Sequence, residues 1–111
     1  MLNSKQRHNL EMAGWAIGDA GDLLELTPEE RSLVETKLAL ADGFRKRREA
    51  LKLTQVEAAK RLSSSQSRIA KIEAADSTVS MDLMMRALFS LGVGREGMAR
   101  ILAAKPGRRA A

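Results

Sequence analysis

Residues 53–73 read LTQVEAAKRLSSSQSRIAKIE. Thr54 and Ser65 each stand one position before a run of helix-forming residues, where a hydroxyl oxygen can accept a hydrogen bond from the first helical turn. A glutamate three residues after Thr54 completes a capping box. This stretch therefore predicts two short helices, over 55–62 and 66–73, joined by a tight turn of serines.

The apolar residues of this stretch recur at helical spacing. We expect Val56, Ala59 and Leu62 to form the inner stripe of the first helix, and Ile69 and Ile72 to form the buried side of the second. The small side chain of Ala59 allows the two helices to cross closely. The pattern predicts a helix, a short turn and a helix packed on a common core.

The flanking sequence adds three more helices. Thr27-Pro28-Glu29-Glu30 combines an N-cap, a proline at the first helical position and a capping box, so a long helix begins there and runs to about Leu51. Ser80 caps a helix over 81–91, which Gly92 is placed to end, and a fifth helix is expected at about 95–104. The core side of the long helix is predicted to hold Leu33, Val34, Leu38, Ala41, Phe44 and Leu51.

Composition sets the class of protein. Aromatic residues make up 3% of the 111 residues and proline occurs twice, so the core consists of helix-compatible aliphatic residues and we expect an all-α fold. The absence of cysteine and the presence of one histidine, His8, exclude disulfides, thiolate chemistry and histidine metal clusters. We expect no cofactor, no metal site and no enzymatic activity. Neither a membrane span nor a signal peptide is visible, which predicts a cytoplasmic protein without a membrane partner.

Charge divides the chain. Residues 1–30 carry two basic and six acidic residues, whereas residues 41–75 carry nine basic and four acidic residues. A basic block beside an acidic segment suggests a polyanion-binding module with a separate interaction segment. We expect an extension over 1–26 with short helices near Gln6–Ala13 and Ala20–Leu24, a main domain over 27–104, and a basic tail over 105–111.

The stretch from Leu53 to Glu73, with its Ala58-Ala59 pair and its Ser63-Ser64 turn, resembles the Xre-type, lambda-repressor-like helix-turn-helix family. The resemblance covers about half of the chain and implies a five-helix domain that binds double-stranded DNA. In that arrangement the second helix of the pair enters the major groove, which is about 12 Å wide. The resemblance therefore implies a sequence-specific transcriptional regulator, most simply a repressor.

On this resemblance the outward residues of the second helix face base edges: Gln66, Ser67, Arg68 and Lys71. Glutamine matches adenine and arginine matches guanine by paired hydrogen bonds. A plain solvated helix face is the alternative for each of the four residues.

The resemblance also implies that Gln55 touches the DNA backbone and that Arg48 and Glu73 form a structural ion pair. Further backbone candidates are the basic and capping residues Arg45, Lys46, Lys52 and Ser65, for which simple solvation is the alternative.

The chain departs from the family pattern at two loops. The turn of the family commonly contains glycine followed by an apolar residue, where this chain has Ser63 and Ser64, and the loop after Glu73 reads Ala74-Ala75-Asp76. A residue other than glycine at positive φ costs about 1 kcal/mol.

A single helix-turn-helix reads only a few base pairs, so such modules usually dimerise on a two-fold repeated site. The fourth and fifth helices offer more apolar residues than one small core needs. We expect a homodimer contact around Met84, Met85, Phe89 and Met98; the alternative is that these residues are core residues or scattered surface residues.

Residues 10–29, which include Trp15, are similar to extensions of Xre-type antitoxins in HigBA-like toxin–antitoxin pairs. This similarity implies a second function, in which the acidic segment covers a basic, RNA-cleaving toxin. The alternative is that four apolar residues of the segment cap the domain core: Trp15, Leu23, Leu24 and Leu26. A structural or RNA-binding adaptor is a third function, but the basic face lacks the aromatic stacking residues typical of such proteins.

Overall fold

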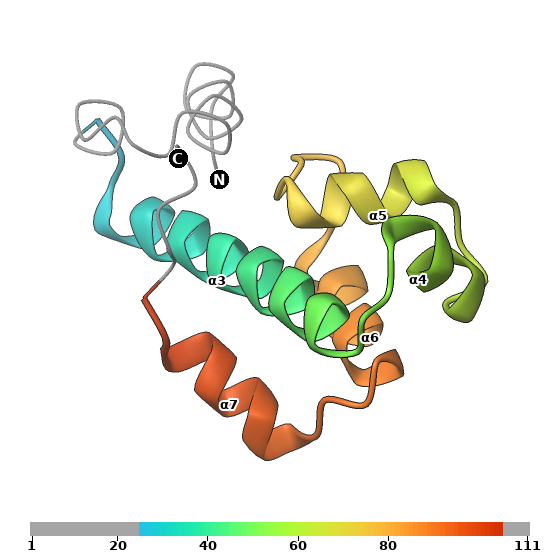
Figure 1. Ribbon diagram of the computed structural model, residues 1–111. Helices are drawn as coiled ribbons and strands as arrows, with labels where there is room; N and C mark the ends of the chain where they lie inside the picture. The colour runs from blue at the N-terminus through green and yellow to red at the C-terminus, as the bar shows by residue number, and fades with distance from the viewer. Residues whose placement is uncertain (1–24, 106–111) are drawn as a thin grey trace.

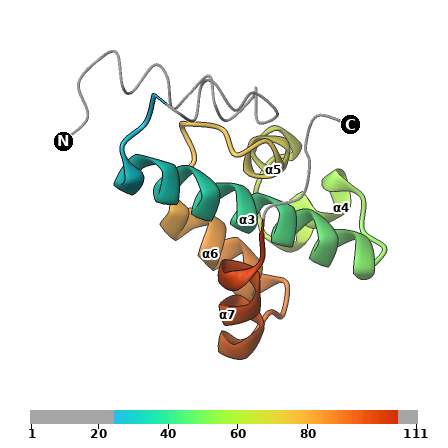
Figure 2. The same cartoon turned by 90° about the vertical axis from the view of Figure 1, so that its left-hand side faces the viewer.

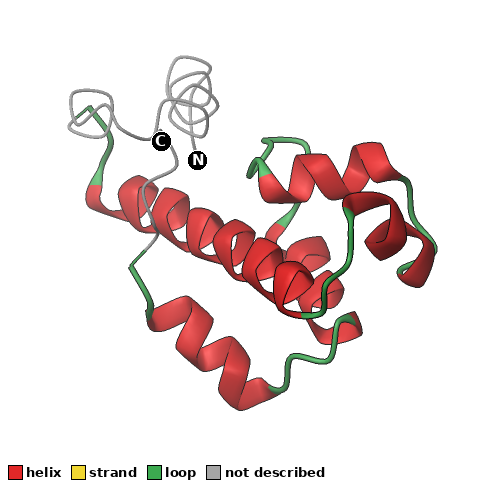
Figure 3. Cartoon of the chain, viewed as in Figure 1, coloured by secondary structure: helices red, strands yellow, loops and turns green. Residues whose placement is uncertain are grey.

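The computed structural model describes residues 25–105, which form five helices and no strand (Figure 3). The all-α class is confirmed, and each helix lies within one residue of its predicted ends. The helices are α3 (Pro28–Ala50), α4 (Gln55–Arg61), α5 (Gln66–Glu73), α6 (Met81–Ser90) and α7 (Arg95–Ala103).

Hydroxyl caps begin four of the five helices. Thr27 Oγ1 accepts a hydrogen bond from the Glu30 amide at 3.1 Å, and the Thr27 amide donates back to Glu30 Oε1 at 2.8 Å. Thr54 forms the same capping box at α4, and single serine caps begin α5 and α6. Because such a cap stabilises a helix by about 1 kcal/mol, these residues fix where each helix starts.

Four consecutive helices, α3 to α6, end in the same Schellman motif. In α4, for example, the Ser64 amide donates to the Ala59 carbonyl at 2.8 Å and the Ser63 amide donates to the Lys60 carbonyl at 3.2 Å. This motif places one residue in the left-handed region, where glycine is favoured. Glycine occupies that position only after α6; the four residues are Lys52 (φ 58°), Ser63 (φ 53°), Ala75 (φ 53°) and Gly92 (φ 89°).

The long helix α3 is the centre of the fold. In Figures 1 and 2, α4 and α5 lie on one side of α3, α6 packs along it, and α7 crosses on the side away from α5. The largest fully buried side chains come from α3, α5, α6 and the C-cap residue of α6: Phe44, Leu40, Ile69, Ile72, Met84, Leu88 and Leu91. This arrangement holds α5 on the core through Ile69 and Ile72 and leaves its other side open.

Two residues predicted to be in the core are exposed. Leu33 is 49% exposed and Val56 is 51% exposed, so both predictions are wrong. In α4 the close contact is made by Ala58 and Ala59, which are buried, and the seven-residue helix is turned so that Val56 in its first turn lies outside the core. In α3, Val34 takes the buried position beside Leu33.

The contact between α3 and α7 depends on a glycine. A Cβ atom at Gly43 would lie 2.8 Å from Cγ2 of Ile101 and 3.0 Å from its Cδ1, which is closer than packed carbon atoms approach. The absence of a side chain at this position lets Ile101 pack directly on the α3 backbone. Gly43 therefore sets the distance between these two helices.

The predicted short helices at Gln6–Ala13 and Ala20–Leu24, Trp15, His8 and most of the basic tail lie outside the described residues. The division into an extension over 1–26, a domain over 27–104 and a tail stays a prediction. Among residues 25–105, no helix combines the length and the apolar character needed to cross a membrane. The same residues contain no cluster of potential metal ligands.

Candidate DNA-binding surface

The helix-turn-helix unit is formed by α4 and α5. The turn between them runs through Ser63 and Ser64, and Ser65 caps α5, since its Oγ accepts a hydrogen bond from the Arg68 amide at 3.1 Å. Ser63 has a left-handed φ at the turn where the family pattern commonly has glycine. Ile69 and Ile72 anchor α5, so the first turn of the helix projects into solvent.

A chain of hydrogen bonds links the core to the start of α5. Arg48 donates to both carboxylate oxygens of Glu73, through Nε to Oε2 and through Nη2 to Oε1 at 2.9 Å. Gln55 Nε2 donates to Oε1 of Glu73 at 3.3 Å, and Gln66 Nε2 donates to Oε1 of Gln55 at 2.7 Å. The ion pair implied by the family resemblance is thus present. Its carboxylate orients the side chain of Gln55, which in turn orients the side chain of Gln66.

The electrostatics of the ion pair follow from its burial. Glu73 is buried and the Arg48 side chain is 13% exposed, so the two charges face each other with little water between them. The hydrogen bond to Glu73 raises the pKa of Arg48 above its already high ordinary value. Arg48 Nη1 also donates to the Leu53 carbonyl at 2.8 Å, which ties the α3–α4 loop to the same group. The Arg48 guanidinium is thus engaged within the fold, by Glu73 and by the Leu53 carbonyl.

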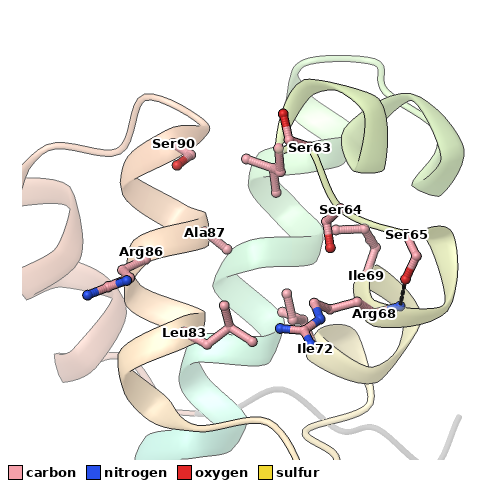
Figure 4. A pocket seen from close by; sticks show the side chains of 11 residues that line it. Ser63, Ser64, Ser65, Arg68, Ile69, Ile72, Leu83, Arg86, Ala87 and Ser90 are labelled. Carbon is pink, nitrogen blue, oxygen red and sulfur yellow. Dashed lines mark hydrogen bonds between the residues drawn. The ribbon is translucent and has the colours of Figure 1, made fainter.

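The four candidate base-contacting residues are all exposed, but they do not share one direction. Ser67 and Lys71 lie on the side of α5 opposite its buried isoleucines, and the exposed Gln66 lies at the edge of that side, beside Gln55 of α4. The side chain of Arg68 extends toward α6 and lies near Leu83 (Figure 4). It lines a groove of about 560 Å³ between the turn and α6. Base contact by Arg68 stays a prediction that requires its side chain to turn away from α6.

The backbone candidates also differ in position. Lys52 is exposed in the loop before α4, close in sequence to Gln55. Arg45 is half-buried and lies 3.8 Å from Asp42, with which it forms an ion pair. Lys46 lines a groove between α3 and α7, on the side of α3 away from α5. Backbone contact stays a prediction for all of them, and the position of Lys46 does not favour it.

The loop after α5 is neutral to acidic. Asp76 Oδ1 accepts hydrogen bonds from the Thr78 hydroxyl and from the Thr78 amide at 2.8 Å, and these bonds lower the pKa of Asp76. Lys37 of α3 is half-buried, and burial lowers its pKa while the charge of Asp76 opposes that shift. The loop thus adds no cation to the open side of α5.

Two of the four residues predicted to form a dimer contact are buried within the single chain. Met84 is fully buried and Met98 is 4% exposed, because both side chains pack in the core of a single chain. These two assignments are therefore wrong. Met85 is half-buried and Phe89 is 44% exposed, so these two remain available to a second chain.

The link between Gln55 and Gln66 was not predicted from the sequence. Each glutamine is the first residue of its helix, Gln55 in α4 and Gln66 in α5. That shared position is the signal that could have indicated the pair, since two adjacent helices that cross near their N-termini bring their first side chains together.

Residues 44–95 match the protein family described as Helix-turn-helix. No curated protein and no solved structure matches the chain significantly. The matched segment begins in α3, contains α4, α5 and α6, and ends at the first residue of α7. The antitoxin branch of this family is not among the matches. Together with the fold, the match identifies residues 44–95 as an Xre-type, lambda-repressor-like helix-turn-helix domain, which is a DNA-binding domain.

Proposed function

We propose that this protein is a transcriptional repressor that binds a palindromic operator as a homodimer and reads it with the N-terminal half of α5. The observation that carries this proposal is the hydrogen-bonded chain from Arg48 through Glu73 and Gln55 to Gln66. It holds an exposed amide at the start of a helix whose opposite side is fixed in the core.

The hydrogen bonds leave Gln66 able to recognise adenine. A glutamine amide carries two N–H donors and one acceptor oxygen. One donor of Gln66 is used by Gln55, so the second can donate to adenine N7 while Oε1 accepts from adenine N6. Such a bidentate pair discriminates against other bases by about 1–3 kcal/mol.

In this proposal Gln55 contacts a phosphate. One N–H of its amide donates to Glu73 and its oxygen accepts from Gln66, which leaves the second N–H for a phosphate oxygen. The N-terminus of α4 adds a partial positive charge. A phosphate contact positions the protein without reading sequence, so Gln55 would set the register in which Gln66 meets the base.

Ser67 and Lys71 complete the reading surface in this proposal. Both are exposed and stand four positions apart on α5, which places them on the same side of the helix. Lysine can donate to guanine and serine can contact several bases. Arg68 joins them only if its side chain leaves the groove beside α6.

The size of the site supports a dimer. One recognition helix covers a few base pairs, and two helices one DNA turn apart, about 34 Å, read a palindrome. Phe89 supports this step because an aromatic side chain that is 44% exposed at the end of α6 is a suitable anchor for an interface. Met85 of the same helix can pack beside it.

Selection of bound duplexes from a random DNA pool at physiological salt tests the proposal. We expect enrichment of a palindrome whose half-sites contain an adenine that Gln66→Ala no longer selects. Lys52→Ala is the matched control: it should weaken binding to all sequences alike and flatten the salt dependence. Binding without enrichment, or equal loss on every sequence for both variants, would refute sequence reading by α5.

A further inference from the structure

A second basic surface lies along the groove between α3 and α7. Two adjoining hollows, of about 440 Å³ and 220 Å³, share Gly97, Arg100 and Ile101 as lining residues. Four basic side chains line them: Lys46, Arg47, Arg100 and Lys105. The acidic lining residues are Glu96 and the buried Asp42, whose carboxylate lies near Arg45. The groove is therefore positively charged.

This groove is separate from the recognition helix. Figures 1 and 2 show α7 on one side of α3 and α5 on the other. A straight duplex that lies against α5 would leave the α3–α7 groove open to solvent. The basic groove is thus not an extension of the surface proposed to read the operator.

The lining residues favour a phosphate backbone over a protein partner. Protein interfaces are anchored by aromatic side chains and other large side chains in well-packed pockets. The apolar lining residues here are Ala39, Val93, Ile101 and Ala104, and the rest of the groove is glycine and charge. A polyanion needs only cations within reach and a surface that lets it approach, which three glycines on the α7 side provide.

We propose that the α3–α7 groove binds the phosphate backbone of a second DNA duplex, so that one protein molecule bridges two duplexes. The contact is independent of sequence, because the groove presents charges and no base-reading helix. If the four cations each neutralise one phosphate, affinity for the second duplex falls about a hundredfold between about 50 and 200 mM salt.

Arg100 is the residue to change. It lines both hollows, is exposed on α7, and is not part of the recognition surface. Arg47 is less suitable because its Nε donates to the Leu91 carbonyl at 2.8 Å and so helps hold the end of α6. Arg86 on α6 is the control for net charge: it is an exposed helical arginine outside the α3–α7 groove. Its substitution by glutamate changes the net charge by the same amount and breaks only a surface ion pair with Asp82.

The test uses the full chain, one duplex fixed to beads and a second, labelled duplex of unrelated sequence, at about 50 mM salt. We expect the wild-type protein to retain the labelled duplex on the beads. Arg100→Glu should reduce this retention at least tenfold, while its affinity for a single duplex stays within about twofold, and Arg100→Lys should retain the wild-type behaviour. Arg86→Glu should bridge as the wild type does.

Three results would overturn the proposal. The first is a wild-type protein that does not bridge duplexes. The second is bridging that survives Arg100→Glu, which would come from the two recognition helices of a dimer. The third is equal loss with Arg86→Glu, which would be an effect of net charge alone. Since the second duplex is of unrelated sequence, the outcome does not depend on whether α5 reads a specific operator.

Discussion

The turn of the helix-turn-helix unit stores backbone strain that a single substitution should release. Ser63 is exposed and has a φ of 53°. A residue with a Cβ atom costs about 1–2 kcal/mol in this region, and glycine costs nothing there. Glycine also gives the unfolded chain more freedom, which opposes the gain by about 0.4–1 kcal/mol. We expect Ser63→Gly to stabilise the protein by about 0.5–1 kcal/mol.

Ala75 provides a comparison at the same backbone angle. Its φ is also 53°, but its side chain is buried. Ala75→Gly would release the same strain and lose one buried methyl group, which contributes about 0.8 kcal/mol. The two effects nearly cancel, so we expect Ala75→Gly to change the free energy of unfolding little. The difference in the free energy of unfolding between the two variants gives the contribution of the buried methyl group separately from that of the strain.

Urea unfolding followed by circular dichroism measures both variants, with the m-value showing whether the unfolded state has changed. For a domain of this size, a gain of 1 kcal/mol corresponds to about 4–8 °C in Tm. Gly92→Ala should have the opposite effect, because φ there is 89° and the new Cβ would lie 2.9 Å from Nη2 of Arg47. A Ser63→Gly variant that is no more stable than the wild type would refute the assignment of strain to this turn.

Three further changes test other parts of the structure. Arg48→Ala leaves the buried carboxylate of Glu73 without its ion-pair partner and should lower the free energy of unfolding by about 3 kcal/mol. The loss is measured as a lower urea midpoint, and a loss below about 1 kcal/mol would contradict the burial of the pair. The lowered pKa of Asp76 means that its hydrogen bonds stabilise the fold above its ordinary pKa of 3.8 and that this contribution is lost as pH falls below that value. Asp76→Asn should therefore flatten the acid side of the profile of stability against pH. An unchanged profile would contradict this role of Asp76. Gly43→Val should displace α7 through Ile101 at a cost of about 1–3 kcal/mol and speed amide exchange in α7 alone, whereas unchanged exchange there would show that Ile101 yields instead.

The helix starts could be predicted because each depends on neighbouring residues. Thr27, Thr54, Ser65 and Ser80 act within their own first turn, and all four form the expected caps. The apolar periodicity was less exact, since it gives the side of a helix that faces the core but not how far each residue lies from the core edge. Val56 shows this limit, because it has the predicted spacing and is nevertheless outside the contact.

The details of the site depend on three-dimensional packing. The resemblance implied the pair of Arg48 and Glu73, but the bond between Gln55 and Gln66 joins side chains eleven positions apart, and it forms only because α4 and α5 cross. The direction of Arg68 likewise depends on the position of α6, which no local pattern contains. Residue types thus identified the candidates, and packing decided which of them act together.

The hydrogen-bonded chain from Arg48 to Gln66 has one buried end and one exposed end. Substitutions at an exposed helix position usually change stability by less than about 0.5 kcal/mol, whereas removal of one partner of a buried ion pair costs about 3–5 kcal/mol. If Gln66 reads a base as proposed, exchanging this residue would change the base preference and leave the buried carboxylate of Glu73 in place. Such a site is open to retargeting, in natural divergence and in the laboratory, at the residue where the chain of bonds ends.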